Sequence, residues 1–150
     1  MSAKPGFAVG DLLPGPVRTI TRQRIEWYDS AMLSAATDEL RQVASNIHTD
    51  EEFAKSQGFA TVNADGMIMT NWCSEMLVRA FGIHYIERGE LRTKYIKPTN
   101  LGVELHVKGR IREGTAQPNG NMVYAIDIWC EDQHGTKLVD GDAKVEVAKG

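Results

Sequence analysis

The spacing of apolar side chains changes along this chain, and each change marks a different kind of element. A short alternating run at Val17, Thr19 and Thr21 follows a segment rich in proline and glycine (Gly10–Pro16), and it predicts an edge strand. After it, apolar residues recur at intervals of three and four, at Ile25, Tyr28, Met32 and Ala35. This spacing predicts a helix with one apolar face, which Thr21 caps and which extends to about Ala36.

Two shorter helical stretches are expected before the middle of the chain. A break near Thr37 opens the first, which carries Leu40 and Val43. The sequence Thr49-Asp-Glu-Glu52 predicts a capping box at the start of the second, in which the threonine and glutamate side chains satisfy free backbone donors. Gly58 suits the end of this second helix.

The third pattern is an apolar run without a polar face. Between Met67 and Phe81, apolar side chains fall on nearly every side of a helix. We therefore expect a helix that is buried on most sides and that ends at Gly82.

Beyond Gly89 the apolar period shortens from about 3.6 residues to 2. Alternation is clearest from Val103 to Ile111, which predicts a strand with one solvent-facing side. Three more strands are expected, over Leu91–Ile96, Met122–Glu131 and Lys137–Val147, with turns at Pro118–Gly120 and Asp132–Gly135. Together they predict an antiparallel meander that curves around the apolar helix, which is an α+β fold.

Composition narrows the class of protein. The chain has 150 residues, the size of one domain, and its net charge of -3 comes without any block of like charge, so a nucleic-acid partner is not expected. The N-terminus lacks the apolar run of a signal peptide, and no stretch approaches the roughly 20 apolar residues that span a bilayer. We therefore expect a cytoplasmic protein without a membrane partner. Cys73 and Cys130 lie in apolar surroundings and are expected to be buried, reduced thiols.

Three short segments around the start of the apolar helix carry the candidate chemistry. They are Asn46-Ile-His48-Thr-Asp50-Glu-Glu-Phe53-Ala54, then Gly58-Phe59, then Ala64-Asp65-Gly66-Met67. Their order and spacing resemble the MaoC-like (R)-specific enoyl-CoA hydratases and dehydratases. Those enzymes carry an Asp-x-Asn-Pro-x-His-x-Asp stretch, a short helix ending near Gly-Phe, and an Ala-His-Gly-Met run that opens the central helix. The resemblance implies a single hot-dog domain over residues 1–150, with an ordered core of about 7–148.

The resemblance also implies an activity. The substrate would be an acyl thioester on coenzyme A or an acyl carrier protein, and the hydro-lyase reaction would add or remove water at the 2,3 double bond without a cofactor or metal. His48 matches the histidine that handles water. The Gly66 N–H would polarise the thioester carbonyl from the positive end of the apolar helix, although a glycine used only as a turn would look the same. Ser74 matches a serine that faces the substrate tunnel, and Asn71, about one turn earlier, is a further candidate substrate contact. A two-fold homodimer is implied as well.

The acid–base partner of His48 is where the sequence departs from the family. The family aspartate lies five residues before the histidine, and that position here is Val43. Asp38 becomes the partner if about five extra residues loop out, or it is simply an acidic residue in the first turn of a helix. Asp65 replaces the family histidine before Gly-Met, and is either a relocated base or a cap of the apolar helix.

Three functions follow from this departure. The first is a hydratase or dehydratase of acyl thioesters. The second keeps the fold but changes the reaction, to a hot-dog thioesterase or a polyketide-type dehydratase or cyclase with a relocated carboxylate. The third is a non-catalytic hot-dog subunit that supports an active partner. A carboxylate within reach of His48 favours the catalytic alternatives over the third.

Overall fold

The computed structural model of the chain describes residues 6–37 and 45–149, and over 32–37 it describes the backbone alone. Within these ranges five strands form one antiparallel sheet: β1 (Leu12–Thr19), β2 (Gly89–Tyr95), β3 (Glu104–Ala116), β4 (Met122–Glu131) and β5 (Lys137–Val147). The same ranges contain four helices: α1 (Arg22–Thr37), α2 (Glu51–Ser56), α3 (Gly66–Phe81) and α4 (Ile83–Arg88). None of these helices is long and apolar enough to cross a membrane.

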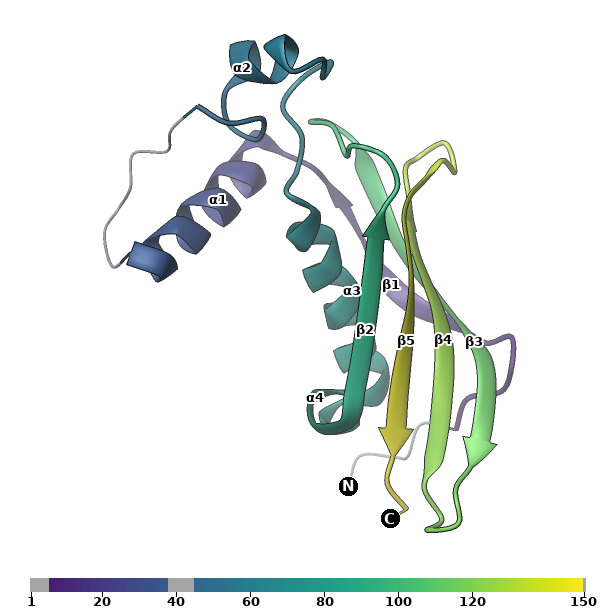
Figure 1. Cartoon of the computed structure of the whole chain (residues 1–150). Helices are drawn as coiled ribbons and strands as arrows, with labels where there is room; N and C mark the ends of the chain where they lie inside the picture. Colours follow the sequence, from purple (N-terminus) through teal and green to yellow (C-terminus); the bar gives the residue numbers. More distant parts are fainter. Residues whose placement is uncertain (1–5, 38–44, 150) are drawn as a thin grey trace.

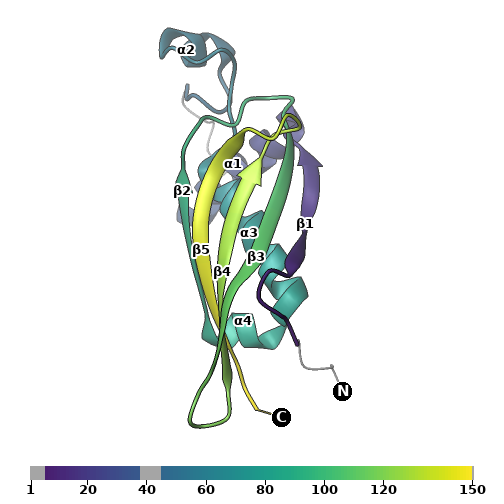
Figure 2. The ribbon, with the colours of Figure 1, turned by 90° about the vertical axis from the view of Figure 1, so that its right-hand side faces the viewer.

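The sheet has the strand order β1-β3-β4-β5-β2 and curves around α3, which lies against its inner face (Figures 1 and 2). This arrangement confirms the predicted α+β hot-dog fold. One pairing differs from the expected meander, because β2 pairs with β5 at the far edge and not with β3. The outer edge of β3 is taken by β1, so β2 closes the opposite edge of the sheet.

Strict alternation predicts β4 and β5 to the residue. The inward side of β4 is buried as expected, at Tyr124, Ile126, Ile128 and Cys130. Strand β3 also alternates, but it continues to Ala116 past a bulge that follows Ile111. Its outer side is polar, as the pattern predicts.

Strand β1 is the expected edge strand, but it begins earlier than predicted. It starts at Leu12, inside the segment rich in proline and glycine, and its register shifts between Pro14 and Val17. Gly15 makes this possible, because a Cβ there would lie 2.0 Å from the carbonyl oxygen of Val107 on β3. A glycine in a strand often marks such a close approach of two backbones.

Helix α3 begins and ends where the apolar run predicts, with the Gly82 N–H donating to the Val78 carbonyl at 2.7 Å. Its buried side chains are Ile68, Met69, Cys73, Met76, Leu77 and Phe81. The side away from them is uncovered, since Met67, Asn71 and Val78 are exposed. Helix α3 is therefore buried or half-buried on most sides, as predicted, apart from this exposed stripe. Helix α4, which the sequence pattern does not predict, turns the chain back into β2.

Most of the buried apolar side chains form one group, here called the sheet cluster. It joins the sheet to α3 and contains Leu13, Met69, Cys73, Met76, Leu77, Phe81, Leu105, Val107, Ile111, Tyr124, Ile126, Ile128, Cys130, Leu138, Val139, Ala143, Val145 and Val147. Cys73 and Cys130 are free and fully buried, as expected, and their Sγ atoms lie 3.6 Å apart. Their mutual hydrogen bond, together with burial, raises the pKa of the Cys130 thiol.

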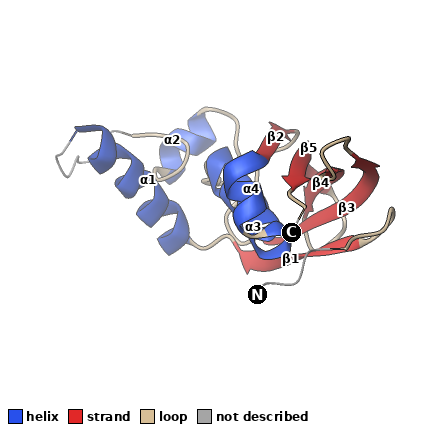
Figure 3. Ribbon diagram, turned by 90° about the horizontal axis from the view of Figure 1, so that it is seen from below, coloured by secondary structure: helices blue, strands red, loops and turns tan. Residues whose placement is uncertain are grey.

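A second region, here called the overhang (residues 20–37 and 45–65), places α2 beyond one end of the sheet and α1 on the side of α3 that faces away from the sheet (Figures 1 and 3). A smaller group of buried side chains, the overhang cluster, ties it to α3: Ile20, Ile25, Ala54, Val62, Ala64 and Ile68. The expected cap of α1 is confirmed, because Thr21 Oγ1 accepts a hydrogen bond from the Arg24 N–H at 3.2 Å. The expected helical stretch with Leu40 and Val43 lies outside the described residues.

The predicted capping box of α2 is wrong by one residue. The cap is Asp50, whose Oδ1 accepts from the Phe53 N–H at 3.0 Å. Thr49 is already engaged, because its N–H and its hydroxyl both donate to Oδ1 of Asn46, at 3.0 and 3.3 Å. The predicted helix end at Gly58 is confirmed, since α2 ends at Ser56 and the Gly58 N–H donates to the Lys55 carbonyl.

Candidate active site

The loop that carries His48 is shaped by one side chain, that of Asn46. Its Oδ1 accepts from the N–H groups of His48 at 2.8 Å and of Thr49 at 3.0 Å, which closes a tight turn. Its amide nitrogen also donates to Asp29 Oδ2 at 3.4 Å, which links the turn to α1. The backbone at His48 is thus fixed by local hydrogen bonds instead of by a regular element.

The His48 ring is oriented by the backbone of Asn63. Its Nδ1 lies 2.8 Å from the Asn63 carbonyl oxygen. A carbonyl only accepts hydrogen bonds, so Nδ1 carries the hydrogen, and in the neutral ring Nε2 keeps its lone pair. The Asn63 N–H in turn donates to the Ile47 carbonyl at 3.2 Å, so the two segments hold each other. The His48 ring is therefore held in the tautomer that can accept a proton at Nε2.

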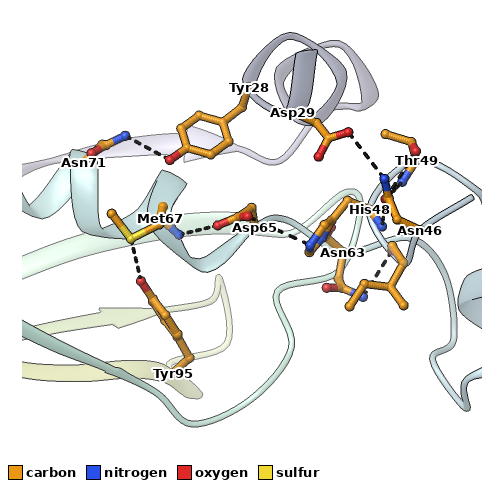
Figure 4. Close-up of polar contacts among 11 residues, drawn as sticks. Tyr28, Asp29, Asn46, His48, Thr49, Asn63, Asp65, Met67, Asn71 and Tyr95 are labelled. Carbon is orange, nitrogen blue, oxygen red and sulfur yellow. Dashed lines mark hydrogen bonds and ion pairs between the residues drawn. The ribbon is translucent and has the colours of Figure 1, made fainter. Parts of the chain in front are cut away.

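The carboxylate nearest to Nε2 among the described residues is that of Asp65, and Figure 4 shows the two side chains directed toward each other. Nε2 and Asp65 Oδ2 are 4.0 Å apart, with the side chains 21% and 31% exposed. The other oxygen, Oδ1, accepts from the Met67 N–H at 2.8 Å and so caps α3. Asp65 is therefore the cap of α3, and its second carboxylate oxygen faces the histidine.

Gly66 follows Asp65 as the first residue of α3. A Cβ on it would lie 2.5 Å from the ring of Tyr95, so the glycine is needed for the packing of that ring. The Gly66 N–H donates no hydrogen bond to any described residue. A free donor at the positive end of a helix is suited to an oxygen that develops negative charge.

The other candidate residues lie farther along α3. Asn71 Nδ2 is 3.5 Å from the hydroxyl of Tyr28 (Figure 4). Ser74 Oγ donates to the hydroxyl of Tyr85 at 3.0 Å, so a tyrosine from α4 occupies the space beside it. Asp38 lies outside the described residues, so the structure does not place it relative to His48.

Two tyrosines lie near this site, and neither stands out in the sequence as a functional candidate. Burial, together with the negative charge of Asp65, raises the pKa of Tyr28 on α1. The hydroxyl of Tyr95, at the end of β2, lies 2.7 Å from Thr70 Oγ1. Tyr28 is predicted only as part of an apolar helix face. For Tyr95 the one signal is its place near the end of the predicted strand Leu91–Ile96.

A cavity of about 260 Å³ lies beside His48 and Gly66. Its walls include His48, Phe59, Asn63, Gly66, Tyr95 and Thr99. Lys97 also lines it and places a positive charge at its wall. Within the part of the chain that the structure describes, no group of three or more His, Cys, Asp or Glu side chains is placed to hold a metal ion.

A larger hollow of about 620 Å³ lies on the outer side of the sheet and is remote from His48. Its charges are partly paired with each other, as in the ion pairs Arg112–Asp127 at 2.8 Å and Lys137–Asp140 at 2.8 Å. It lacks both the histidine and the helix start, so we place the candidate site in the smaller cavity.

No protein-family model matches this sequence, and a search of the curated proteins finds no match. Solved structures do resemble the fold. A MaoC-like dehydratase from Rhodospirillum rubrum aligns with a TM-score of 0.71 and 21% identity, over 96% of this chain and 94% of that one. A monoamine oxidase regulatory protein from Archaeoglobus fulgius aligns with a TM-score of 0.72 and 19% identity, over 96% and 92%. The R-hydratase PhaJ1 from Pseudomonas aeruginosa aligns with a TM-score of 0.66 and 18% identity, over 96% and 84%. At these identities the likeness establishes the hot-dog fold.

Proposed function

We propose that this protein is a hydratase or dehydratase of acyl thioesters, with His48 and Asp65 as its acid–base pair. The observation that carries the proposal is the 4.0 Å separation of His48 Nε2 and Asp65 Oδ2 beside the free N–H of Gly66. Two proteins of the same fold are named as a dehydratase and an R-hydratase, which supports this class of reaction.

The pair is suited to holding a water molecule. Nε2 and Oδ2 are too far apart for a hydrogen bond, and in the neutral ring both atoms are acceptors. One water can donate a hydrogen bond to each of them, and its oxygen then faces the substrate. As that oxygen bonds to C3 of the enoyl group, His48 accepts the proton and Asp65 stabilises the resulting imidazolium. The imidazolium returns the proton to C2, so one water is added in total.

The thioester carbonyl must carry negative charge between these two steps. The Gly66 N–H has no acceptor among the described residues, and Gly66 lines the same cavity as His48 at the start of a 16-residue helix. A preorganised donor at such a position stabilises the enolate oxygen. The carrier would be coenzyme A or an acyl carrier protein, and Lys97 at the cavity wall is a candidate contact for a phosphate.

The placement of Asp65 bears on the other two hypotheses. A non-catalytic subunit does not need a carboxylate that faces His48. The position of Asp65 therefore supports a catalytic role. A thioesterase would use the same pair to direct water at the carbonyl carbon instead of C3. Release of free thiol from an acyl-CoA substrate distinguishes that reaction from hydration.

A homodimer is part of the proposal. Large apolar side chains are exposed on α3, on α4 and at the end of β2, namely Met67, Val78, Ile83, Ile86, Tyr95 and Ile96. Strand β2 is also the free edge of the sheet on that side. A second copy laid along β2 would extend the sheet and cover these side chains. Light scattering is expected to give the mass of a dimer, and Ile86→Glu is expected to shift it toward monomer. A stable wild-type monomer at micromolar concentration would contradict this part.

The reaction is tested with crotonyl-CoA, by following loss of the enoyl-thioester absorbance together with the appearance of free thiol. The wild type is expected to hydrate the double bond without releasing thiol. His48→Ala is expected to lower kcat by about 10²- to 10⁴-fold, the usual contribution of a general acid–base group, with an unchanged melting temperature. Full activity of His48→Ala would reject the mechanism.

The carboxylate is identified by two matched variants, Asp65→Asn and Asp38→Asn. Asparagine still caps a helix, so Asp65→Asn is expected to keep the fold while it removes the charge that faces His48. We expect a loss of kcat of about 10²-fold or more for Asp65→Asn and near wild-type activity for Asp38→Asn. The opposite result would assign the role to Asp38.

A further inference from the structure

The wall of the candidate cavity contains a buried hydroxyl with no role in the structure so far. Thr99 is 1% exposed, and its Oγ1 is shielded from solvent without a hydrogen-bond partner among the described residues. Thr99 lines the same cavity as His48 and Gly66. A buried hydroxyl without a partner is costly, and valine would fill the same space without that cost. An unsatisfied group of this kind at a pocket wall points to a ligand that completes it.

The backbone of Thr99 is fixed relative to both halves of the site. Its carbonyl accepts from the Ala64 N–H at 2.8 Å, and the neighbouring residues Asn63 and Asn100 form an antiparallel bridge. Ala64 is two residues before Gly66, and the Asn63 carbonyl orients the His48 ring. The Thr99 hydroxyl is therefore attached to the same short ladder that positions the histidine and the start of α3.

This hydroxyl and the Gly66 N–H have the same chemical character. Each is a hydrogen-bond donor without an acceptor among the described residues, and Thr99 and Gly66 both line one cavity. Two preorganised donors that converge on one oxygen stabilise a developing oxyanion more than one does. A hydroxyl proton also rotates to follow its acceptor, so Thr99 can adjust to an oxygen set by Gly66.

We propose that the Thr99 hydroxyl donates the second hydrogen bond to the thioester carbonyl oxygen, and that with the Gly66 N–H it binds the enolate oxygen. The inference rests on the proposed function, because it takes an acyl thioester as the ligand. Thr99 then contacts the substrate directly, and the Gly66 N–H is one of two hydrogen-bond donors to the carbonyl oxygen.

The test compares Thr99→Val, which keeps the shape and removes the hydroxyl, with Thr99→Ser, which keeps the hydroxyl. Loss of one oxyanion donor typically lowers kcat by about 10²- to 10³-fold, which we expect for Thr99→Val with crotonyl-CoA. Thr99→Ser is expected to stay within about tenfold of wild type, since it can still donate. Thr99→Val should melt at or above the wild-type temperature, because no native hydrogen bond is lost.

A second measurement reports on the carbonyl itself. Butyryl-CoA labelled with ¹³C at the carbonyl has no double bond to hydrate, so its infrared carbonyl band can be recorded in the bound state. Hydrogen bonds to the oxygen lower the frequency of this band. We expect the bound band of Thr99→Val to lie closer to that of free butyryl-CoA than the bands of wild type and Thr99→Ser. Thr99→Ala serves as the variant without hydroxyl if Thr99→Val does not fold.

The outcomes separate the two proposals. If the wild type does not hydrate crotonyl-CoA, the proposed function falls and this inference falls with it. If the wild type is active and Thr99→Val matches it in kcat and in the carbonyl band, only the role of Thr99 is overturned. A slow Thr99→Val with an unshifted band also overturns it, because the hydroxyl would then act somewhere other than on the carbonyl.

Discussion

The sheet with α3 and the overhang are stabilised in different ways. The sheet cluster contains 18 buried residues drawn from β1, β3, β4, β5 and α3, whereas the overhang cluster contains six. In the overhang, much of the geometry comes from individual hydrogen bonds, such as those that Asn46 makes around His48. Apolar burial resists global unfolding, while a few polar contacts in a small cluster permit local opening.

The difference matters because the candidate catalytic pair spans the boundary. His48 belongs to the loop of the overhang, and Asp65 is the residue at which the overhang joins α3. Trp72 and Val103 pack against both clusters and connect the two regions. The pair can therefore be disturbed from the weaker side while the sheet remains folded.

The largest effect is expected in the sheet cluster. Ile126 is 0% exposed at the middle of β4, so Ile126→Ala should lower the free energy of unfolding by about 2–5 kcal/mol. Denaturant melts followed by circular dichroism measure this loss. The control is Val17→Ala on β1, whose side chain is 55% exposed and whose loss should change stability by less than about 0.5 kcal/mol. Equal effects of the two would mean that the sheet cluster does not dominate stability.

A smaller loss of stability, with local opening of the overhang, is expected in the overhang cluster. Ile25 is 2% exposed on α1, but it belongs to a unit that can open by itself. Ile25→Ala should lower the free energy of unfolding by about half as much as Ile126→Ala, at about 1–2 kcal/mol, and should increase amide exchange between residues 46 and 64. Trp27→Ala, on the same helix but 68% exposed, is the matched control. Unchanged exchange in that segment would show that the two clusters open together.

The turn around His48 gives a third test, with its main effect on the site. Asn46→Ala removes the acceptor of the His48 and Thr49 N–H groups, and should lower kcat about tenfold, equivalent to about 1.4 kcal/mol, with little change in melting temperature. Asn46→Ser keeps an oxygen acceptor and should recover part of the rate. A rate equal to wild type would mean that the turn does not depend on this side chain.

The smallest effect concerns acid. Glu51 Oε2 accepts hydrogen bonds from the Thr61 hydroxyl at 3.0 Å and the Val62 N–H at 3.3 Å, and these bonds lower the pKa of Glu51 below its ordinary value of 4.5. A lowered folded-state pKa gives stability that is present above 4.5 and is lost as the pH falls through the lower value. Melting temperatures measured across this range should fall more steeply for wild type than for Glu51→Gln. Parallel curves would show that Glu51 does not hold α2 to the segment before Asp65.

The parts of the fold that sequence predicts best are those where one physical cause acts alone. Alternation fixes β4 and β5 because each has one buried and one wet side. The cap of α2 is displaced because Asn46, three residues earlier, already binds Thr49. Pairing of β2 with β5 depends on which edge β1 occupies, which no local pattern shows.

The residues of the candidate site also differ in how well the sequence predicts them. His48, Asp65 and Gly66 lie in short segments whose order is visible in the sequence, and the cap formed by Asp65 follows from its place directly before the apolar helix. Tyr95 against Gly66 and Thr99 at the cavity wall arise from contacts between distant segments. Asp38 stays a prediction, because it lies outside the described residues.

The neighbouring thiols of Cys73 and Cys130 allow opening of the sheet cluster to be followed by thiol labelling. Both are fully buried between α3 and β4, and the raised pKa of Cys130 leaves little thiolate for an alkylating reagent to attack. A reagent in solution therefore modifies them only after α3 separates from the sheet. Opening of the overhang alone leaves both thiols unlabelled. The labelling rate of a variant therefore reports on the sheet cluster, whereas its turnover reports on the overhang.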